Sequence, residues 1–501
     1  MVRETGFTSP LRLFSENPEE VLQRLREGYI EYLGGATDQF TDLHALYALR
    51  SGLIDECAAA FPDPRWDPQI PIRVLLTAAV AGALAGEYAL CQTGAALHSP
   101  AVLSELGYNV AWLTPGEGLS RRGTEEEALF HYDTVRKLLG QIAAADRASG
   151  CVPGESLIRW WNETVGPALL RRAGGGTGAW ILDCTKIVVN LENGRYEGSA
   201  VTKDDDGNVF RGYKLALLSS LIDEGRVLVH VGWDSARPAD ITVARPLLGK
   251  GLPLSRGDTL LQDRGLNDGP RISCLKRDVG VDVVFGLKKD YLSYGYAVGK
   301  AVVRPEAHWD DHPTREGQQI LLIKNIGVVW KGLTVPINGC VVRERDEKEA
   351  DGYQYWVFGA TNLALTARGI IRSYEARSEC EEDHRQIKGP QWELDEFYST
   401  KQVEILFHVL LVLFAYNLCQ VYGQTEAGQR FAGKTKRARQ RELRRDSTRR
   451  LVVIAGPYYA VLEELDVADV LLDVEGAPKE RLRGVVRRLK DARRVGKRAA
   501  V

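Results

Sequence analysis

Four side chains in the second half of the sequence have the types and spacing of a catalytic helix. Tyr374, Arg377, Glu381 and Lys388 stand at intervals of three, four and seven residues. A helix returns to one face at such intervals, so the sequence predicts a carboxylate flanked by a phenol and two cations. A carboxylate binds a divalent metal, whereas Arg, Lys and Tyr bind phosphate oxygens. The pattern indicates an enzyme acting on a DNA backbone; an amphipathic surface helix with an Arg377–Glu381 ion pair is the alternative.

The same four residues resemble the Tyr-x2-Arg-x3-Glu-x6-Lys signature of the insertion-sequence-4 family of bacterial DDE transposases. The resemblance covers roughly residues 176–420. The family places two aspartates upstream, each at the end of a strand, and the matching residues are Asp183 in GAWILDCTKIVV and Asp263 in GDTLLQDRGLNDG. Both are expected at the carboxyl ends of strands, where open α/β sheets carry their catalytic groups.

The resemblance implies a metal centre made by Asp183, Asp263 and Glu381. A few carboxylates suffice for Mg²⁺, which prefers oxygen ligands and keeps some waters, and Mn²⁺ is expected to substitute for it. A pair of such ions suits phosphoryl transfer, because one activates a water or a DNA 3′-hydroxyl and the other stabilises the leaving oxygen.

The cationic and phenolic residues are implied DNA contacts. By the resemblance, Tyr374, Arg377 and Lys388 hold the backbone of the transposon end near the cleavage site. Arg264, which directly follows the second aspartate, either contacts phosphate or pairs with a neighbouring acid, and both interpretations stay open.

Other polar residues near these motifs have simpler interpretations. Asp240 is expected to cap the N-terminus of a helix. His308 and His312 lack the glutamate that a zinc protease helix requires after its first histidine, which argues against a metal site there. The acids around the proposed glutamate ligand lie off the shared helical face and are expected in solvent: Glu375, Glu379, Glu382 and Asp383.

Composition describes an ordinary globular chain with an uneven charge distribution. Of 501 residues, 44% are hydrophobic and 26% charged, and the formal net charge is −2. Residues 430–450 and 479–498 each carry ten Lys or Arg against two acids, which indicates either polyanion contact or solvated charged segments. Eight scattered cysteines and no apolar signal core at the N-terminus favour a reduced, cytoplasmic setting, associated with the nucleoid. The apolar run 405–419 is short for a membrane span and predicts a buried core helix.

The fold class expected is α/β, with a ribonuclease-H-like catalytic core interrupted by a β-rich insertion. The expected parts are a helical N-terminal region for DNA-end binding (1–150), the first part of the core (176–290), the β-rich insertion (291–365), the second part of the core with the glutamate helix (366–425), and a basic C-terminal region for DNA contact or dimerisation (426–501). In the N-terminal region, ALFHYDTVRKLL is either a recognition helix that turns Arg136 and Lys137 toward phosphates or a packing helix.

Local patterns predict most elements of the core. Apolar runs and turn residues predict a strand at 179–191, a hairpin at 214–223 and 226–235, a short helix at 239–248, a strand at 258–263, a helix at 269–278 and a strand at 281–287. Short strands are predicted within 297–305, 318–330, 333–346 and 353–362.

These features together predict a transposase that cleaves double-stranded DNA at terminal inverted repeats and joins it to target DNA. By the resemblance, the element moves by cut and paste, often through a hairpin on its end. A homodimer is expected to bridge the two transposon ends. The alternatives are a DNA-binding regulator derived from such an enzyme, and a ribonuclease-H-like nuclease without strand transfer.

Overall fold

The computed structural model describes most of the chain. The described residues are 15–35, 39–68, 70–87, 89–90, 93, 100–107, 130–131, 133–204, 207–248, 253–303, 308–349, 351–378, 385–431, 434–447 and 450–473. The chain forms two compact units, one made of residues 1–153 with 433–501 and the other of residues 154–432.

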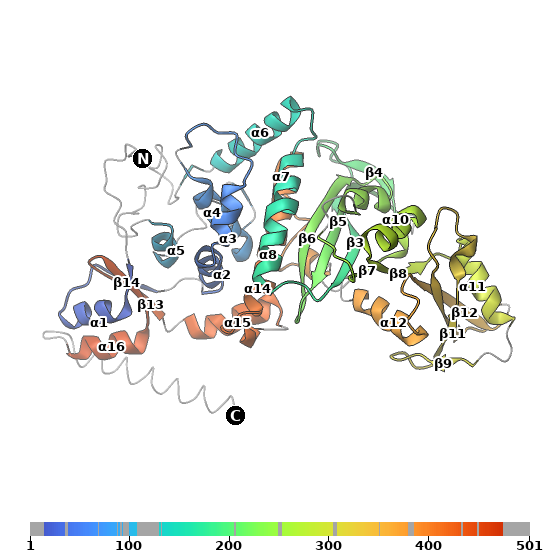
Figure 1. Ribbon diagram of the computed structural model, residues 1–501. Coiled ribbons are helices and arrows are strands. Elements are labelled where there is room, and N and C mark those ends of the chain that lie inside the picture. Colours follow the sequence, from blue (N-terminus) through green and yellow to red (C-terminus); the bar gives the residue numbers. More distant parts are fainter. Residues whose placement is uncertain are drawn as a thin grey trace. The chain divides into compact units, whose positions relative to one another are not determined.

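The first unit contains a small sheet built from both ends of the chain (Figure 1). Its strands, in spatial order, are β1 (Ser15–Glu16), β14 (Tyr458–Glu463), β13 (Arg450–Ala455) and β2 (Tyr32–Gly35). Helices α1 (Pro18–Arg26) and α16 (Glu464–Asp473) cover it and bury Val21, Leu25 and Val467 against the strands. The N-terminal region, expected to be helical, therefore also supplies strands to this sheet.

Helices make up the rest of the described part of this unit. They are α2 (Gln39–Arg50), α3 (Leu53–Ala59), α4 (Ile72–Ala85), α5 (Pro100–Glu105), α6 (Asp133–Ala148) and α15 (Lys436–Ser447). On α6, Arg136 and Lys137 are exposed but pair with Asp133 at 3.7 and 3.8 Å. On the basic helix α15, Lys436 and Arg439 are buried inside the unit, so only part of this predicted basic region faces outward.

The second unit is organised around one mixed sheet, to which ten described strands belong. Its path runs β4 (Ala200–Lys203), β5 (Val209–Leu221), β3 (Ala179–Val189), β7 (Thr259–Gln262), β8 (Asp282–Leu287), β12 (Tyr353–Ala360), β11 (Asn338–Arg345), β10 (Gln318–Ile323) and β9 (Asp310–Asp311), and β6 (Arg226–Ser235) also pairs with β5. β3, β7 and β8 run parallel to one another, and the other neighbours pair antiparallel.

The half of this sheet from β6 to β8 agrees with the predicted core. β5 and β6 form the expected antiparallel hairpin, and β3, β7 and β8 occupy the segments where strands are predicted. Three antiparallel strands followed by two parallel ones, with helices packed on the sheet, are consistent with a ribonuclease-H-like domain.

The other half of the sheet is formed by strands of the segment expected to be a β-rich insertion. β12 pairs directly with β8, with Val357 opposite Leu287, so the strands of residues 310–360 continue the central sheet. This pairing satisfies backbone groups of β8 that would otherwise form an exposed edge. The strand predicted within 297–305 is wrong, because helix α11 (Leu292–Val302) occupies this segment. α11 buries Ser293, Ala297 and Ala301, which recur at the four-residue spacing of a helix.

Helices cover the sheet and complete the second unit. They are α7 (Glu155–Trp160), the π-helix η3 (Trp161–Val165), α8 (Gly166–Arg172), α9 (Asp240–Ala244), η4 (Arg245–Leu248), η5 (Arg264–Leu266), α10 (Gly269–Cys274), the π-helix η6 (Leu275–Val279), η7 (Ile326–Val329), α12 (Ala367–Glu375), η8 (Ala376–Ser378), α14 (Gln402–Gly423) and η9 (Gln429–Phe431). The predicted short helix after β6 is confirmed as α9 with η4, and the one after β7 as α10 with η6.

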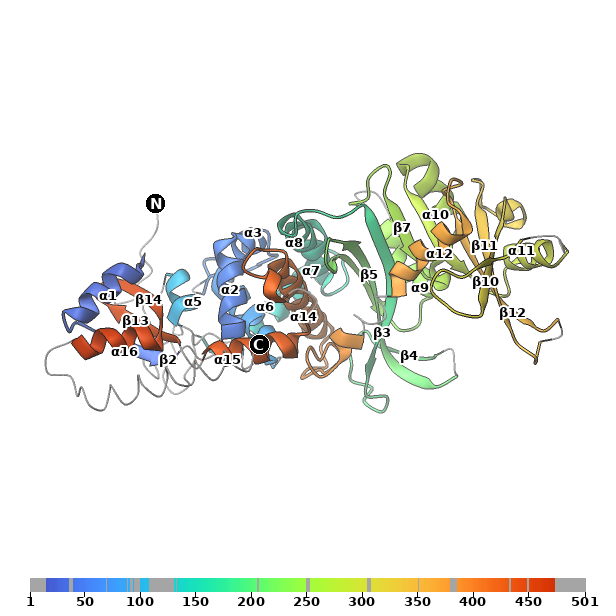
Figure 2. The same cartoon turned by 90° about the horizontal axis from the view of Figure 1, so that it is seen from below.

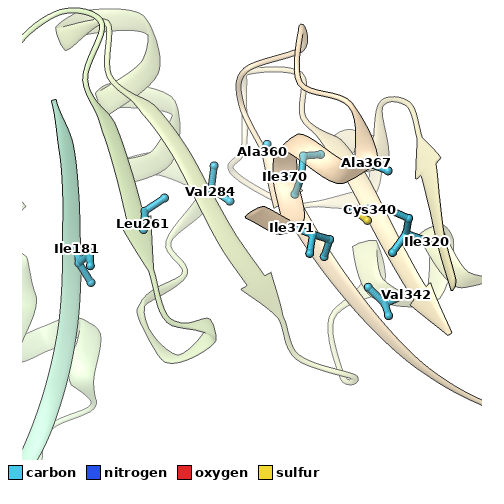
Figure 3. Packing of buried hydrophobic residues seen from close by; sticks show 10 residues of the cluster. All are labelled: Ile181, Leu261, Val284, Ile320, Cys340, Val342, Ala360, Ala367, Ile370 and Ile371. Carbon is cyan, nitrogen blue, oxygen red and sulfur yellow. The ribbon is translucent and has the colours of Figure 1, made fainter. Parts of the chain in front are cut away.

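Helix α12 packs on β8, β12, β11 and β10 of the central sheet (Figure 2). Its Ile370 and Ile371 belong to one apolar cluster with Ile181, Leu261 and Val284, one residue from each of the three parallel strands (Figure 3). The same cluster continues to Ile320 on β10 and to Cys340 and Val342 on β11. One apolar layer therefore runs from α12 across the sheet to the strands that carry the two aspartates.

The apolar run near residue 410 forms a longer helix than the sequence suggests. α14 spans 22 residues and is, by length and composition, apolar enough to cross a membrane, but 94% of its most apolar window is buried inside the protein. This burial is typical of the core helix that the sequence predicts.

Two asparagines close the outer edge of the sheet at β6. The Asn417 amide accepts a hydrogen bond from the Leu228 N–H at 2.9 Å and donates one to the Leu228 carbonyl at 2.8 Å. Asn162 on η3 does the same for Val231, accepting at 2.7 Å and donating at 3.0 Å. Each amide replaces one residue of a neighbouring strand, so the edge of the sheet is satisfied and the helices are held against it.

Candidate active site

The register of two parallel strands brings Asp183 and Asp263 together. The pairing of β3 with β7 ends at Leu182 opposite Gln262, and each aspartate is the next residue of its chain. Matched positions on parallel neighbours project to the same face of a sheet. β3 continues to Val189, so the expectation that Asp183 ends its strand is wrong: it lies mid-strand, level with the point where β7 stops.

Backbone groups orient both carboxylates. Asp183 Oδ1 accepts a hydrogen bond from the Cys184 N–H at 2.9 Å. Asp263 caps the short helix η5, and its Oδ2 accepts from the Gly265 N–H at 3.4 Å. The Asp183 side chain is 11% exposed and that of Asp263 33%, so the pair spans the boundary between the core and the surface.

The Arg377 guanidinium bridges the two aspartates. Its Nη1 lies 3.4 Å from Asp183 Oδ2, and its Nη2 lies 3.6 Å from Asp263 Oδ1. The arginine side chain is only 10% exposed, so a buried cation compensates two carboxylates of like charge. The alternative of an exposed surface arginine is therefore wrong.

The signature residues do not share one continuous helix. α12 ends at Glu375, and Arg377 lies on the following 3-10 turn, η8. Residues 385–388 are helical again, and Lys388 belongs to this second segment. The predicted single helical face is therefore wrong, although Tyr374 and Arg377 still meet at the aspartates. Glu381 lies outside the described residues, which omit 379–384.

Burial raises the pKa of Asp183 to about 6, and the nearby Asp263 carboxylate acts in the same direction. Arg377 and the Cys184 N–H oppose this rise, because both stabilise the charged form. The carboxyl group of Asp183 therefore holds its proton more tightly than an exposed aspartic acid does.

Tyr374 supports the arginine from the side of the sheet. Its ring centroid lies 4.6 Å from that of Phe358 and 5.2 Å from Arg377 Cζ. The phenol packs over Gly286, where an added Cβ would lie 3.1 Å from the phenol oxygen. Burial raises the pKa of Tyr374, so the group stays neutral.

A polar network that the sequence analysis missed holds the turn after Asp263. Gln262 Nε2 donates to the Leu266 carbonyl at 3.3 Å and to Asn267 Oδ1 at 3.1 Å. Asn267 Nδ2 in turn donates to the Gly286 carbonyl on β8 at 2.6 Å. The sequence signal for this network is the glutamine at the end of the apolar run DTLLQ, since a buried amide there requires hydrogen-bond partners.

The other predicted DNA contacts have different environments. Arg264 is exposed and forms no ion pair with any residue that the structure describes, which leaves its charge available beside Asp263. Lys388 is partly buried and donates a hydrogen bond to the Lys186 carbonyl on β3. Burial lowers the pKa of Lys388.

Two other acidic residues near the motifs, Asp240 and Glu375, also differ from expectation. Asp240 is the first residue of α9 rather than its cap, since Ala239 holds the cap position, and its Oδ1 pairs with Lys214 Nζ at 2.7 Å. Glu375, expected in solvent, has a side chain only 24% exposed and contacts the turn before β10.

The arrangement suits a divalent cation. Two carboxylates supply the oxygen ligands that Mg²⁺ prefers, and in the structure a buried guanidinium compensates their charge. Among the described residues no group of three or more His, Cys, Asp or Glu is arranged to hold a metal ion, and the third predicted ligand, Glu381, is not one of them. Asp183 and Asp263 therefore fit as two carboxylate ligands of a metal centre.

Comparison with known proteins finds a family model that covers the segment carrying this site. Residues 177–418 match the family model described as the transposase DDE domain, a segment that contains both aspartates, Arg377 and the proposed glutamate. The match supports a DDE transposase, a type of enzyme that transfers DNA phosphoryl groups and generally uses divalent metal ions. A search of curated proteins found no match to the chain.

Proposed function

We propose that this chain is an insertion-sequence-4-type DDE transposase that cleaves DNA at terminal inverted repeats and joins the freed ends to target DNA. The single observation that carries the proposal is the buried junction of Asp183, Arg377 and Asp263 inside the segment that matches the transposase DDE domain. A protein that only binds DNA has no need for a pair of convergent carboxylates beside an exposed cation.

In this proposal, Asp183, Asp263 and Glu381 hold the metal, which is Mg²⁺ and is replaceable by Mn²⁺. Bound metal supplies activation of the attacking water or 3′-hydroxyl and stabilisation of the leaving oxygen. The strands β3 and β7 position two of these ligands, and the packed end of α12 approaches them from the sheet face.

The surrounding side chains bind and orient the DNA backbone. Arg264, which is exposed beside Asp263, contacts a phosphate near the cleavage point in this proposal. Arg377 compensates the carboxylates, and its guanidinium charge lies beside the position that the scissile phosphate would take. Tyr374 keeps that guanidinium in place, and Lys388 secures the second helical segment to β3. The working form is a cytoplasmic homodimer that bridges two transposon ends.

A cleavage and joining assay tests this proposal. Purified protein would be incubated with Mg²⁺, a supercoiled target plasmid, and a labelled duplex that carries the terminal repeat of the element. A duplex with a scrambled repeat and the Glu381→Gln variant are the controls. The proposal predicts nicking at the repeat boundary and a labelled product joined to the plasmid, both lost in the variant.

Two other outcomes identify the alternative functions. Cutting of both duplexes without joining would indicate a ribonuclease-H-like nuclease. Tight binding of the repeat by both proteins, with no cutting by either, would indicate a regulator derived from a transposase.

A further inference from the structure

Glu375 is the last residue of α12 and stands two positions before Arg377. Its carboxylate contacts residues His312–Arg315, here called the 312–315 turn, which joins β9 to β10. Thr314 Oγ1 donates a hydrogen bond to Glu375 Oε1 at 2.7 Å. Arg315 Nε and His312 Nε2 lie 3.6 and 3.9 Å from the same oxygen. Three side chains of one turn therefore surround one carboxylate oxygen.

The buried ring of His312 folds this turn. Its Nδ1 accepts hydrogen bonds from the backbone N–H groups of Thr314 at 3.3 Å and Arg315 at 3.1 Å. Its side chain is 4% exposed, and burial lowers the pKa of His312. A neutral ring is required here, because a protonated Nδ1 has no lone pair to accept with. The ring thus holds the Thr314 hydroxyl in the direction of Glu375.

Local helix structure does not explain where Glu375 points. A carboxylate in the last turn of a helix faces the negative end of the helix dipole, which is unfavourable. Glu375 is nevertheless partly buried, and its partners are about sixty residues away in sequence. The contact therefore holds the end of α12 in a position that the helix alone would not favour.

We propose that Glu375 is a positioning residue, and that its attachment to the 312–315 turn sets Arg377 against the two aspartates. The distances from Arg377 to Asp183 and Asp263, 3.4 and 3.6 Å, are long for charge-assisted hydrogen bonds. A displacement of the α12 end by about 1 Å would therefore break at least one of them, and errors of that size cost about a hundredfold in rate. The inference rests on the proposed function only where rate is the readout.

The direct test removes the Thr314 hydroxyl and keeps the shape of the side chain. Thr314→Val deletes the donor to Glu375, whereas Thr314→Ser keeps it and serves as the conservative rescue. Glu349→Gln, at the exposed Lys289–Glu349 pair of the same sheet region, is the matched control. Thermal unfolding of all four proteins establishes that each is folded before any rate is compared.

Two readouts are measured on the folded full-length proteins. Hydrogen exchange of the peptide 367–378 reports the order of the α12 end, and we expect it to be about tenfold faster in Thr314→Val. Single-turnover cleavage of a saturating repeat duplex is expected to fall at least about tenfold in Thr314→Val. Thr314→Ser and Glu349→Gln should stay within about twofold of the wild type in both readouts.

A double-mutant cycle separates positioning from general loosening. If the turn acts through Arg377, then Thr314→Val should slow cleavage far less in the Arg377→Gln background than in the wild type. Fully additive losses, or failure of serine to rescue, would overturn the inference. Unchanged exchange in peptide 367–378 would overturn it as well, whatever the cleavage result. If the wild type cuts no DNA, the proposed function fails, and the exchange data alone decide whether the turn orders this segment.

Discussion

The Arg377 guanidinium lies 3.4 Å from Asp183 Oδ2 in a buried ion pair that joins the end of α12 to the middle of β3. This relationship links a residue of the C-terminal signature to the first upstream aspartate across 194 positions of sequence. In the proposed enzyme, the same two carboxylates would also hold a metal ion, so Arg377 and the metal would compete for them.

This competition predicts the behaviour of Arg377→Gln. Removing one partner of a buried charge cluster leaves like charges uncompensated, so the metal-free protein should lose about 3 kcal/mol of unfolding free energy. Mn²⁺ should bind the variant about tenfold more tightly than the wild type and raise its melting temperature further. Calorimetric Mn²⁺ titration and thermal unfolding measure both.

The surface pair of Arg277 and Asp278, at 2.9 Å, provides the control for that experiment. Arg277→Gln should leave both the stability and the Mn²⁺ affinity unchanged, because exposed ion pairs contribute little. Weaker Mn²⁺ binding by Arg377→Gln than by the wild type would show that the arginine supports the metal rather than competing with it.

The raised pKa of Asp183 predicts how stability depends on pH without metal. Its folded-state pKa of about 6 lies above the ordinary aspartate value of about 4, so the folded state binds the proton more tightly. Ionisation of this group therefore lowers stability as pH rises from about 4 to about 6, by up to about 3 kcal/mol in total. Asp183→Asn should be more stable than the wild type at pH 7 in EDTA, and the two should converge near about pH 4.

Urea denaturation at several pH values measures this difference directly. Because both proteins share every other titrating group, the subtraction isolates Asp183. A stability difference that stays constant across the pH range would mean that the aspartate ionises normally in the fold. Metal affinity of the wild type should also weaken as pH falls below about 6, since the ligand must lose its proton first.

The contact between Tyr374 and Gly286 predicts a mutation that acts through crowding. Gly286→Ala places a methyl group 3.1 Å from the phenol oxygen, so the tyrosine must shift and Arg377 must follow it. We expect DNA cleavage about tenfold slower with little loss of stability. Tyr374→Phe removes the crowded oxygen, so the double variant should cleave faster than Gly286→Ala alone. A double variant slower than either single one would disprove the steric explanation.

The asparagine that closes the sheet edge predicts a large effect on stability. Asn417→Ala leaves the buried N–H and carbonyl of Leu228 without their partner, which costs about 1–3 kcal/mol for each buried group. Gln424→Ala, at an exposed amide just beyond the same helix, should change stability by less than about 0.5 kcal/mol. Equal effects of the two substitutions in urea denaturation would contradict the role of Asn417.

Local sequence patterns predict the part of the site that neighbouring residues determine. The apolar runs before Asp183 and Asp263 specify buried strands, and parallel pairing of β3 with β7 then brings the two carboxylates together. The hairpin of β5 with β6 is likewise encoded by adjacent runs and a short turn.

Features that depend on distant pairings were not accessible in this way. The helical spacing of Tyr374 and Lys388 suggested one helix, but packing on the sheet ends α12 at Glu375 and directs Arg377 inward. The attachment of Glu375 to Thr314 and the pairing of β12 with β8 join segments far apart in sequence. No local periodicity shows which strands become neighbours in a sheet.

The most direct test of the central claim compares wild type with Asp263→Asn on a duplex carrying the terminal repeat, in Mg²⁺. The substitution keeps the shape of the side chain and its cap on η5 but removes the charge that would hold metal. We predict that cleavage at the repeat boundary is lost, while affinity for the duplex stays within about threefold. Cleavage by Asp263→Asn at the wild-type rate would contradict the assignment of this carboxylate, and with it the proposed active site.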